Sequence, residues 1–165
     1  MAKSESRKTG DIFEEKTARW MKKNGYKIVA RNWTKPPHEL DIVAIKGKTL
    51  VFTEVKSGSG AFFEDPETRI DEKKMRSLAV AAKQFVLDLS MKNIDVKQLD
   101  IRFDAAAITF DKDKNITEFK YYENYFICGE EYYEILCPAL RHCDRHVRKK
   151  ERFFGHFDAH QRKRS

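Results

Sequence analysis

Short apolar runs dominate segments 38–45 and 50–56, and runs of this length that are rich in Val, Ile and Phe are typical of buried β-strands. The connection between them contains Gly47-Lys48, which suits a two-residue type II′ turn with glycine in the first position. The two segments are therefore predicted to form a hairpin in which paired residues have numbers that sum to 95.

Other segments carry helical or strand patterns around this hairpin. Apolar residues at three- and four-residue spacing predict helices over 11–24 and 71–90. Gly25 is expected to end the first helix, because glycine tolerates the left-handed conformation found at helix C-termini. Short apolar runs predict further strands over 26–33, 102–110 and 117–126.

Both faces of the hairpin are apolar, which indicates a strand pair covered on two sides. We expect one face to carry Leu40, Ile42, Val51 and Val55. We expect the other face to carry Val43, Ile45, Leu50 and Phe52. The order of elements is helix, three strands, helix, two strands, so the pattern predicts an α/β protein built as a three-layer α/β/α sandwich.

Charged residues interrupt the apolar pattern of the hairpin at matching positions. The predicted pairing puts Asp41 opposite Glu54 and Glu39 opposite Lys56, with all four side chains on one face. Opposed carboxylates destabilise a hairpin unless a cation lies between them, and carboxylate oxygens suit Mg²⁺ or Mn²⁺. A structural ion pair is the alternative explanation for the same residues.

The chemistry that needs this arrangement is metal-assisted hydrolysis of a phosphodiester. Asp41 and Glu54 would hold the ion, together with the backbone carbonyl of Val55. Lys56 would orient the attacking water and offset negative charge in the transition state. A further acid from the first helix, Glu14 or Glu15, could complete the ligand set.

Length and composition restrict the class of protein. The 165 residues, 41% of them hydrophobic, suffice for one ordinary domain with an appendage. A stretch of about 18 apolar residues and a secretory signal are both missing, so we expect no membrane partner. Three cysteines without a signal point to the cytoplasm.

Positive charge is concentrated at the C-terminal end. Residues 141–165 hold nine Lys or Arg and three acids, which is +6 of the net +7. Such a tail suits phosphate backbones, and Arg148, Lys149 and Lys150 are candidate nucleic-acid contacts. A solvated, partly disordered end explains the same charges equally well.

Three cysteines and a histidine in this region suggest a zinc site. Cys128, Cys137, Cys143 and His146 form a competent tetrahedral Zn²⁺ set, although the spacing is one residue short of the CCCH zinc-finger pattern. The rival interpretation, which we favour, is a basic amphipathic helix in which Cys143 is apolar filling.

The residues that carry these patterns resemble a known family. They are Glu14, Gly25-Tyr26, Ala30-Arg31-Asn32-Trp33, Glu39-Leu40-Asp41-Ile42, Thr49 through Lys56, Lys74, Leu78, Ala82 and Arg102-Phe103-Asp104. They resemble the PD-(D/E)XK nuclease superfamily, which includes restriction endonucleases and Holliday-junction resolvases, and more closely the YraN-like bacterial family. The resemblance covers about residues 9–128.

The resemblance implies a restriction-endonuclease-like fold with a mixed central sheet. It also implies Asp41, Glu54 and Lys56 as the catalytic core, Glu14 as a helix-borne ligand, and Glu39 and Lys74 as neighbours of the site. The chain departs from the family at His38, Thr34 and Ser57-Gly58, where the family usually has Gly or Ala, Arg, and Thr-Arg.

Lys74, His38 and Ser57 are further candidate contacts to nucleic acid, although His38 suits a polar strand edge at least as well.

The predicted organisation is a flexible segment 1–9, a nuclease-like domain 10–128 and a basic extension 129–165. The leading hypothesis is a Mg²⁺-dependent endonuclease acting on DNA, including branched or damaged DNA, with RNA as a second substrate class and a homodimer as a candidate assembly. The alternatives are a nucleic-acid-binding module with little or no turnover, and an interaction protein that uses its basic tail.

Overall fold

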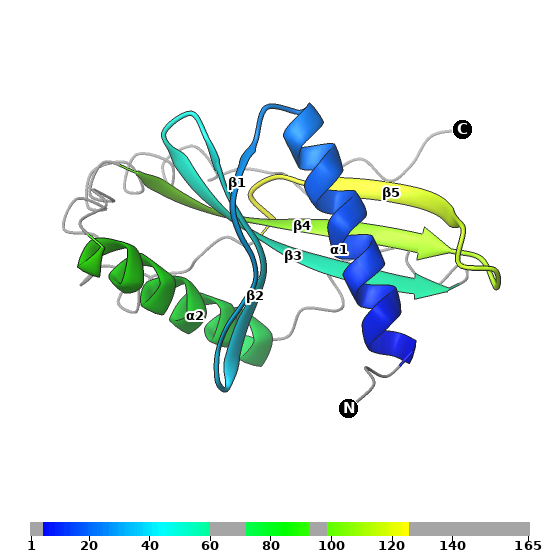
Figure 1. Ribbon diagram of the computed structural model, residues 1–165, viewed down its shortest axis with the longest axis horizontal. Coiled ribbons are helices and arrows are strands. Elements are labelled where there is room, and N and C mark those ends of the chain that lie inside the picture. Colours follow the sequence, from blue (N-terminus) through cyan, green and yellow to red (C-terminus); the bar gives the residue numbers. More distant parts are fainter. Residues whose placement is uncertain (1–4, 60–71, 93–98, 126–165) are drawn as a thin grey trace, which may run out of the picture.

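The computed structural model describes residues 5–59, 72–92 and 99–125, which form two helices and five strands (Figure 1). The elements in chain order are α1 (Glu5–Lys23), β1 (Lys27–Lys35), β2 (His38–Lys46), β3 (Thr49–Ser59), α2 (Glu72–Met91), β4 (Asp100–Phe110) and β5 (Ile116–Tyr122). Each of the helices and strands predicted from the sequence is present, and the order of elements is the predicted one.

The five strands form one mixed sheet in the order β1-β2-β3-β4-β5. Neighbouring strands are antiparallel except for β3 and β4, which are parallel and are joined through α2. A parallel pair needs such a crossover because its strands start at the same edge of the sheet. The hairpin of β2 and β3 follows the predicted register from Lys46–Thr49 to Ile42–Thr53.

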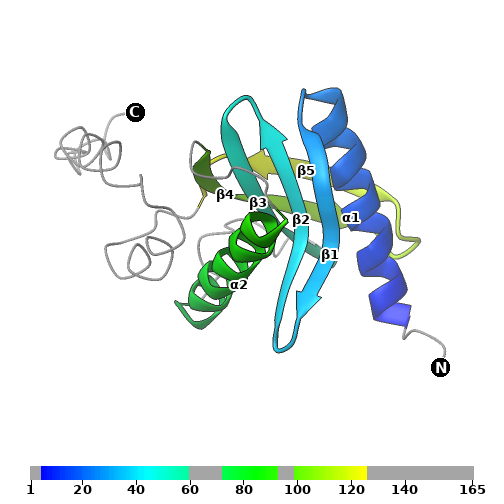
Figure 2. The same ribbon diagram turned by 60° about the vertical axis from the view of Figure 1, so that its left-hand side comes forward.

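The helices cover different faces of the sheet, and β1 and β2 run between them in Figure 2. On one face the α2 residues Leu78, Ala82 and Phe85 pack against Leu50 and Phe52 of β3. The other face packs against α1, through a cluster that contains Ala18, Met21, Ile42, Ala44 and Val51. This arrangement confirms the predicted α/β/α sandwich with a mixed central sheet.

Gly25 ends α1 as expected. Its φ of 84° is the left-handed conformation that glycine adopts without strain. The amide of Gly25 donates to the carbonyl of Lys22 at 3.2 Å, and the amide of Tyr26 donates to that of Met21 at 3.0 Å. These bonds satisfy the last carbonyls of the helix and turn the chain into β1.

Several details of the predicted elements differ in the structure, and the last strand, predicted over 117–126, ends at Tyr122. Helix α1 begins at Glu5 rather than at residue 11, so it extends into the segment 1–9 that we expected to be flexible. That extension is polar, so apolar periodicity could not detect it. Leu40 packs with Val43, Leu50 and Phe52, on the face opposite the one predicted for it. Regular alternation in β2 is therefore lost between Leu40 and Ile42.

A buried polar network joins the last two strands to β3. Asp104 is fully buried and accepts two hydrogen bonds from Arg102, at 2.8 and 2.7 Å, and one from the Tyr121 hydroxyl at 2.8 Å. The Tyr121 hydroxyl also lies 3.0 Å from the hydroxyl of Thr53. Burial and the nearby Asp104 charge raise the pKa of Tyr121, so its hydroxyl keeps its proton. The network therefore fixes β3 at the residue immediately before Glu54.

The sequence-based predictions for the tail lie outside the described residues. They concern the extension 129–165, the candidate zinc ligands Cys128, Cys137, Cys143 and His146, and the basic residues Arg148, Lys149 and Lys150. Within the described ranges, neither helix combines the length and apolar character needed to cross a membrane.

Candidate active site

The candidate site lies where β2 and β3 stop pairing with each other. Their ladder ends at Ile42 and Thr53; beyond this pair β2 continues beside β1, and β3 continues beside β4 (Figure 1). Asp41 and Glu54, which we predicted to be a directly opposed pair, follow immediately. Where the pairing with the backbone of β2 ends, the Val55 amide donates to the Asp41 carboxylate at 2.8 Å. The predicted pairing therefore holds up to the site and ends there.

Glu54 is the buried centre of this cluster, with a side chain that is 3% exposed. Its Oε1 atom lies 2.8 Å from the ammonium of Lys56, two residues along β3, and 2.9 Å from that of Lys74 on α2. Its Oε2 atom is buried and has no hydrogen-bond partner. Leaving a buried charged oxygen unpartnered is costly, so this atom is suited to receive a ligand from outside the chain.

Asp41 is the most strongly perturbed acid of the cluster. Burial and the neighbouring charge of Glu54 raise its pKa from 3.8 to about 7, with a smaller contribution from Glu14. The hydrogen bond from the Val55 amide and the charge of Lys74 act in the opposite direction. Near neutral pH the side chain is therefore poised between its charged and its protonated form.

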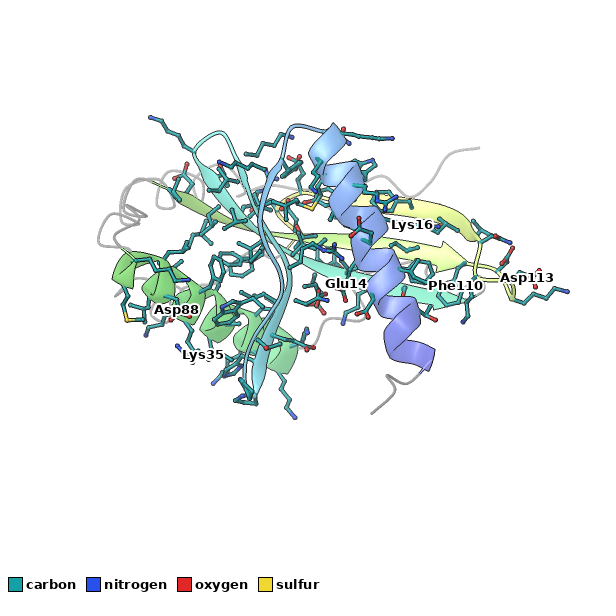
Figure 3. The ribbon with its side chains drawn as sticks, in the orientation of Figure 1. Glu14, Lys16, Lys35, Asp88, Phe110 and Asp113 are labelled. Atoms are coloured by element: carbon teal, nitrogen blue, oxygen red, sulfur yellow. The ribbon has the colours of Figure 1, made fainter. Side chains whose placement is uncertain are left out.

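Glu14 is the acid that α1 directs toward the sheet, beside β2 and β3 in Figure 3. Burial and the charge of Asp11 raise its pKa, whereas a hydrogen bond from the Asn32 side chain lowers it. Its Oε2 atom is buried without a hydrogen-bond partner. Glu15, the other acid considered from the sequence, is instead paired with Arg19 and Arg31. The structure therefore selects Glu14 as the helix acid near the site.

The donor set fits a hard divalent cation in its chemistry. Asp41, Glu54 and Glu14 supply carboxylate oxygens, which Mg²⁺ and Mn²⁺ prefer, and two of these oxygens are buried without partners. Among the residues that the structure describes, however, no three His, Cys, Asp or Glu side chains converge as a ready metal-binding group. The carboxylates thus influence one another's charge without forming a closed coordination shell.

Small residues on β4 flank the site. In the parallel ladder Ala105 pairs with Glu54 and Ala107 pairs with Lys56. Paired residues of adjacent strands point to the same face, so alanine methyl groups are the neighbours of the two charged side chains along the sheet. The sheet itself therefore takes up little space beside Glu54 and Lys56.

The three candidate contacts to nucleic acid in the described part of the chain are placed differently. Lys74 is bound to Glu54, and so it belongs to the cluster itself. His38 lies 3.0 Å, through Nδ1, from the hydroxyl of Ser77 on α2, a contact that ties the start of β2 to the helix. Ser57 is exposed on β3, one residue beyond Lys56.

Two residues that support the site could not be assigned a role from the sequence. Asn32 hydrogen-bonds to Glu14 and has a φ of 49°, a conformation that asparagine tolerates better than most residues. Ser77 meets His38 from across the sheet–helix interface. An asparagine in a strand that otherwise favours apolar residues is a signal for a special backbone position, but it does not reveal the partner.

The fold and the site together define an α/β/α protein with a mixed five-stranded sheet and a buried carboxylate–lysine cluster where the pairing of its central hairpin ends. The family described as Uncharacterised protein family UPF0102 matches residues 13–108, more than half of the chain, and the chain belongs to this family. The family match confirms the resemblance to the YraN-like bacterial group.

Relatives in this family come from several bacteria. A UPF0102 protein of Kosmotoga olearia is 48% identical over 96 residues, which are 58% of this chain and 81% of the relative. One of Desulforamulus reducens is 34% identical over 116 residues, which are 70% of this chain and 92% of the relative. Among solved structures, Pyrococcus furiosus SfsA in complex with Ca²⁺ aligns at 16% identity over 72% of this chain and 63% of the other, with a TM-score of 0.29. A TM-score of 0.29 is too low to show that the two proteins share a fold.

Proposed function

We propose that this chain is a Mg²⁺- or Mn²⁺-dependent endonuclease that hydrolyses phosphodiester bonds in DNA. The observation that carries the proposal is the state of Glu54. One oxygen of this buried carboxylate is bound by two lysines and the other has no partner, and the charge of the same carboxylate helps to raise the pKa of Asp41. A purely structural ion pair would satisfy both oxygens, because an unpartnered buried charge is destabilising.

Asp41 and Glu54 would hold the cation, with the Val55 carbonyl and Glu14 as further donors. When bound, the ion would polarise the phosphate and lower the pKa of a water molecule. The Val55 amide orients Asp41 by its 2.8 Å hydrogen bond, so the carboxylate is held in place by the backbone of the neighbouring strand. Such preorganisation reduces the entropy lost when a ligand binds.

Lys56 would act on the reacting phosphate and on the attacking water. Its ammonium is anchored on Glu54 at 2.8 Å, yet its side chain is 36% exposed and can be reached from solvent. A lysine is a compact positive charge on a long stem, so it can stay near Glu54 while contacting a phosphate oxygen. There it would offset the negative charge that develops in the transition state.

Nicking of supercoiled plasmid DNA in Mg²⁺ or Mn²⁺ tests this proposal, together with a panel of single-stranded, branched and RNA substrates. We expect Asp41→Asn and Lys56→Ala each to lower the cleavage rate by roughly 10²-fold or more while DNA binding persists. Asp113→Asn and Lys112→Ala are matched controls, because both residues are exposed near the β4–β5 turn. These two variants should cleave DNA like the wild type.

Two results would reject the endonuclease. One is a wild type that cuts none of these substrates in either metal; salt-dependent DNA binding would then indicate the nucleic-acid-binding module instead. The other is equal cleavage by wild type and both site variants, which would trace the activity to a contaminant or to another part of the chain.

A further inference from the structure

Lys74 brings a positive charge from helix α2 to the buried carboxylate of Glu54. Its ammonium lies 2.9 Å from Glu54 Oε1, and its side chain is 28% exposed. Burial lowers the pKa of Lys74, but the hydrogen bond to Glu54 and the charges of Glu54, Asp41 and Glu39 raise it by more, so three carboxylates act on one ammonium. The residue comes from α2, whereas its acidic neighbours come from β2 and β3.

The arrangement on Glu54 is asymmetric. Lys56 and Lys74 bind the same oxygen, Oε1, although the second oxygen is buried and free of hydrogen-bond partners. Lys56 is tied to this position by the strand that also carries Glu54, but Lys74 reaches it from a helix. A divalent ion that binds Glu54 brings two positive charges close to both ammonium groups, and the nearest like charges then repel one another.

We propose that Lys74 is an internal cation that neutralises the carboxylate cluster in the metal-free chain and is displaced from Glu54 when a divalent ion binds. This inference rests on the proposed function, since it concerns the same site. It explains how the buried carboxylate of Glu54 is accommodated when no ion is bound.

Displacement gives Lys74 a second position beside the occupied site. Its four-carbon stem lets the ammonium move while the helix stays in place. A DNA phosphate that approaches the metal then meets an ammonium released next to it. The chain would thus couple metal binding to the exposure of a phosphate-binding charge.

Mn²⁺ titration of the full-length chain, followed by the electron paramagnetic resonance of the free ion, tests the inference without any substrate. We expect Lys74→Met to bind Mn²⁺ on the order of fivefold to tenfold more tightly than the wild type, because a competing charge is gone. Lys74→Arg keeps the charge and should stay within about twofold of the wild type. Lys73→Met is the matched control on the exposed side of the same helix.

Thermal unfolding supplies a second measurement. Without metal, Lys74→Met should melt at a lower temperature than the wild type, because Glu54 loses one of its two partners. Saturating Mn²⁺ should then raise the melting temperature of Lys74→Met by more degrees than it raises that of the wild type. The reason is that stabilisation by a ligand grows with the logarithm of its affinity for the folded chain.

Equal Mn²⁺ affinity in wild type and Lys74→Met, or the same tightening in Lys73→Met, would overturn the inference while leaving the endonuclease proposal intact. Tighter binding by Lys74→Met in a chain that cleaves nothing would uphold the inference and reject the nuclease. A wild type and variants that bind no Mn²⁺ at all would overturn both.

Discussion

At the scale of single residues, Asp41 makes the fold sensitive to pH. Its folded pKa of about 7 lies above the ordinary value of 3.8, so between these values the folded chain holds a proton that the unfolded chain has released. Stability therefore falls as the pH rises through this window. The contribution is fully present below pH 3.8 and lost above about pH 7, which is the reverse of an acid stabilised by a salt bridge.

Asp41→Asn should therefore stabilise the metal-free chain at pH 8. Asparagine cannot ionise, so the variant avoids a charge buried beside Glu54, and we expect a gain of roughly 1–3 kcal/mol in the free energy of unfolding. Urea unfolding in a chelating buffer at pH 8 and at pH 4.5 measures this. At pH 4.5, near the start of this window, the carboxyl of the folded wild type is protonated, so the two chains should differ much less than at pH 8.

Asp113→Asn serves as the control for this comparison, because the residue is exposed and should show no such pH-dependent difference. Destabilisation of Asp41→Asn at both pH values would contradict the prediction. That result would mean that the hydrogen bond to the Val55 amide outweighs the burial of charge.

Charge-bearing residues of the hairpin could be picked out from the sequence because they break an apolar pattern. The pattern located Asp41, Glu54 and Lys56, and the structure places Glu54 and Lys56 in contact. It could not show that β2 and β3 stop pairing at this point, since a side chain that replaces a backbone partner leaves no periodic signal. Nor could it assign Lys74 to Glu54, because that contact depends on where a helix crosses the sheet.

At the scale of elements, α2 is held on the sheet by aromatic side chains. Phe85, which is buried, meets Trp33 of β1 and Phe52 of β3 edge to face, at centroid distances of 5.6 and 6.0 Å. Edge-to-face contact is a favoured arrangement of aromatic pairs. The same helix carries Lys74 and Ser77, so its packing sets the position of two groups near the site.

Phe85→Ala should cost roughly 3–5 kcal/mol of stability, since it leaves a cavity among aromatic neighbours. Guanidinium unfolding followed by tryptophan fluorescence measures the loss. Leu87→Ala on the same helix is the matched control: Leu87 is 43% exposed, and its truncation should cost less than about 1 kcal/mol. A Phe85→Ala variant as stable as Leu87→Ala would show that α2 is held by other contacts.

The elements themselves were largely predictable because their apolar residues repeat with the period of a helix or a strand. The polar turns at the start of α1 were missed for the same reason, since they bury no apolar stripe that a periodic pattern could reveal. Leu40 was assigned to the wrong face because alternation assumes a regular strand, and β2 is irregular where it leaves β3. The irregular part of β2 thus lies next to the candidate site.

At the scale of the whole molecule, the positive charge lies mainly outside the body of the chain. The last 25 residues (141–165) hold +6 of the net charge of +7, so the first 140 residues together carry +1. A nearly neutral body has little long-range attraction for DNA. Any strongly salt-dependent binding should therefore depend on the C-terminal residues.

Replacing Arg148, Lys149 and Lys150 together by Gln in the full-length chain tests this. DNA affinity should fall, and the slope of log affinity against log salt should become shallower by up to about 3, because each lost phosphate contact removes about 0.9 from the slope. Fluorescence anisotropy across a salt series measures both. Lys22, Lys23 and Lys112 replaced by Gln give a control of equal charge, and an equal loss in that control would locate the DNA contacts elsewhere.

The sheet order, which follows the chain order from β1 to β5, has a consequence for how the chain folds. Hairpins between successive strands close short loops and form early, whereas the parallel β3–β4 pair must enclose α2 before it can close. Glu54 lies on β3, at the seam between the early hairpin and that later pair. Its partner Lys74 lies on α2 and reaches Glu54 only when the helix packs on the sheet and β3 pairs with β4. We therefore expect the carboxylate–lysine cluster to assemble in the last step of folding.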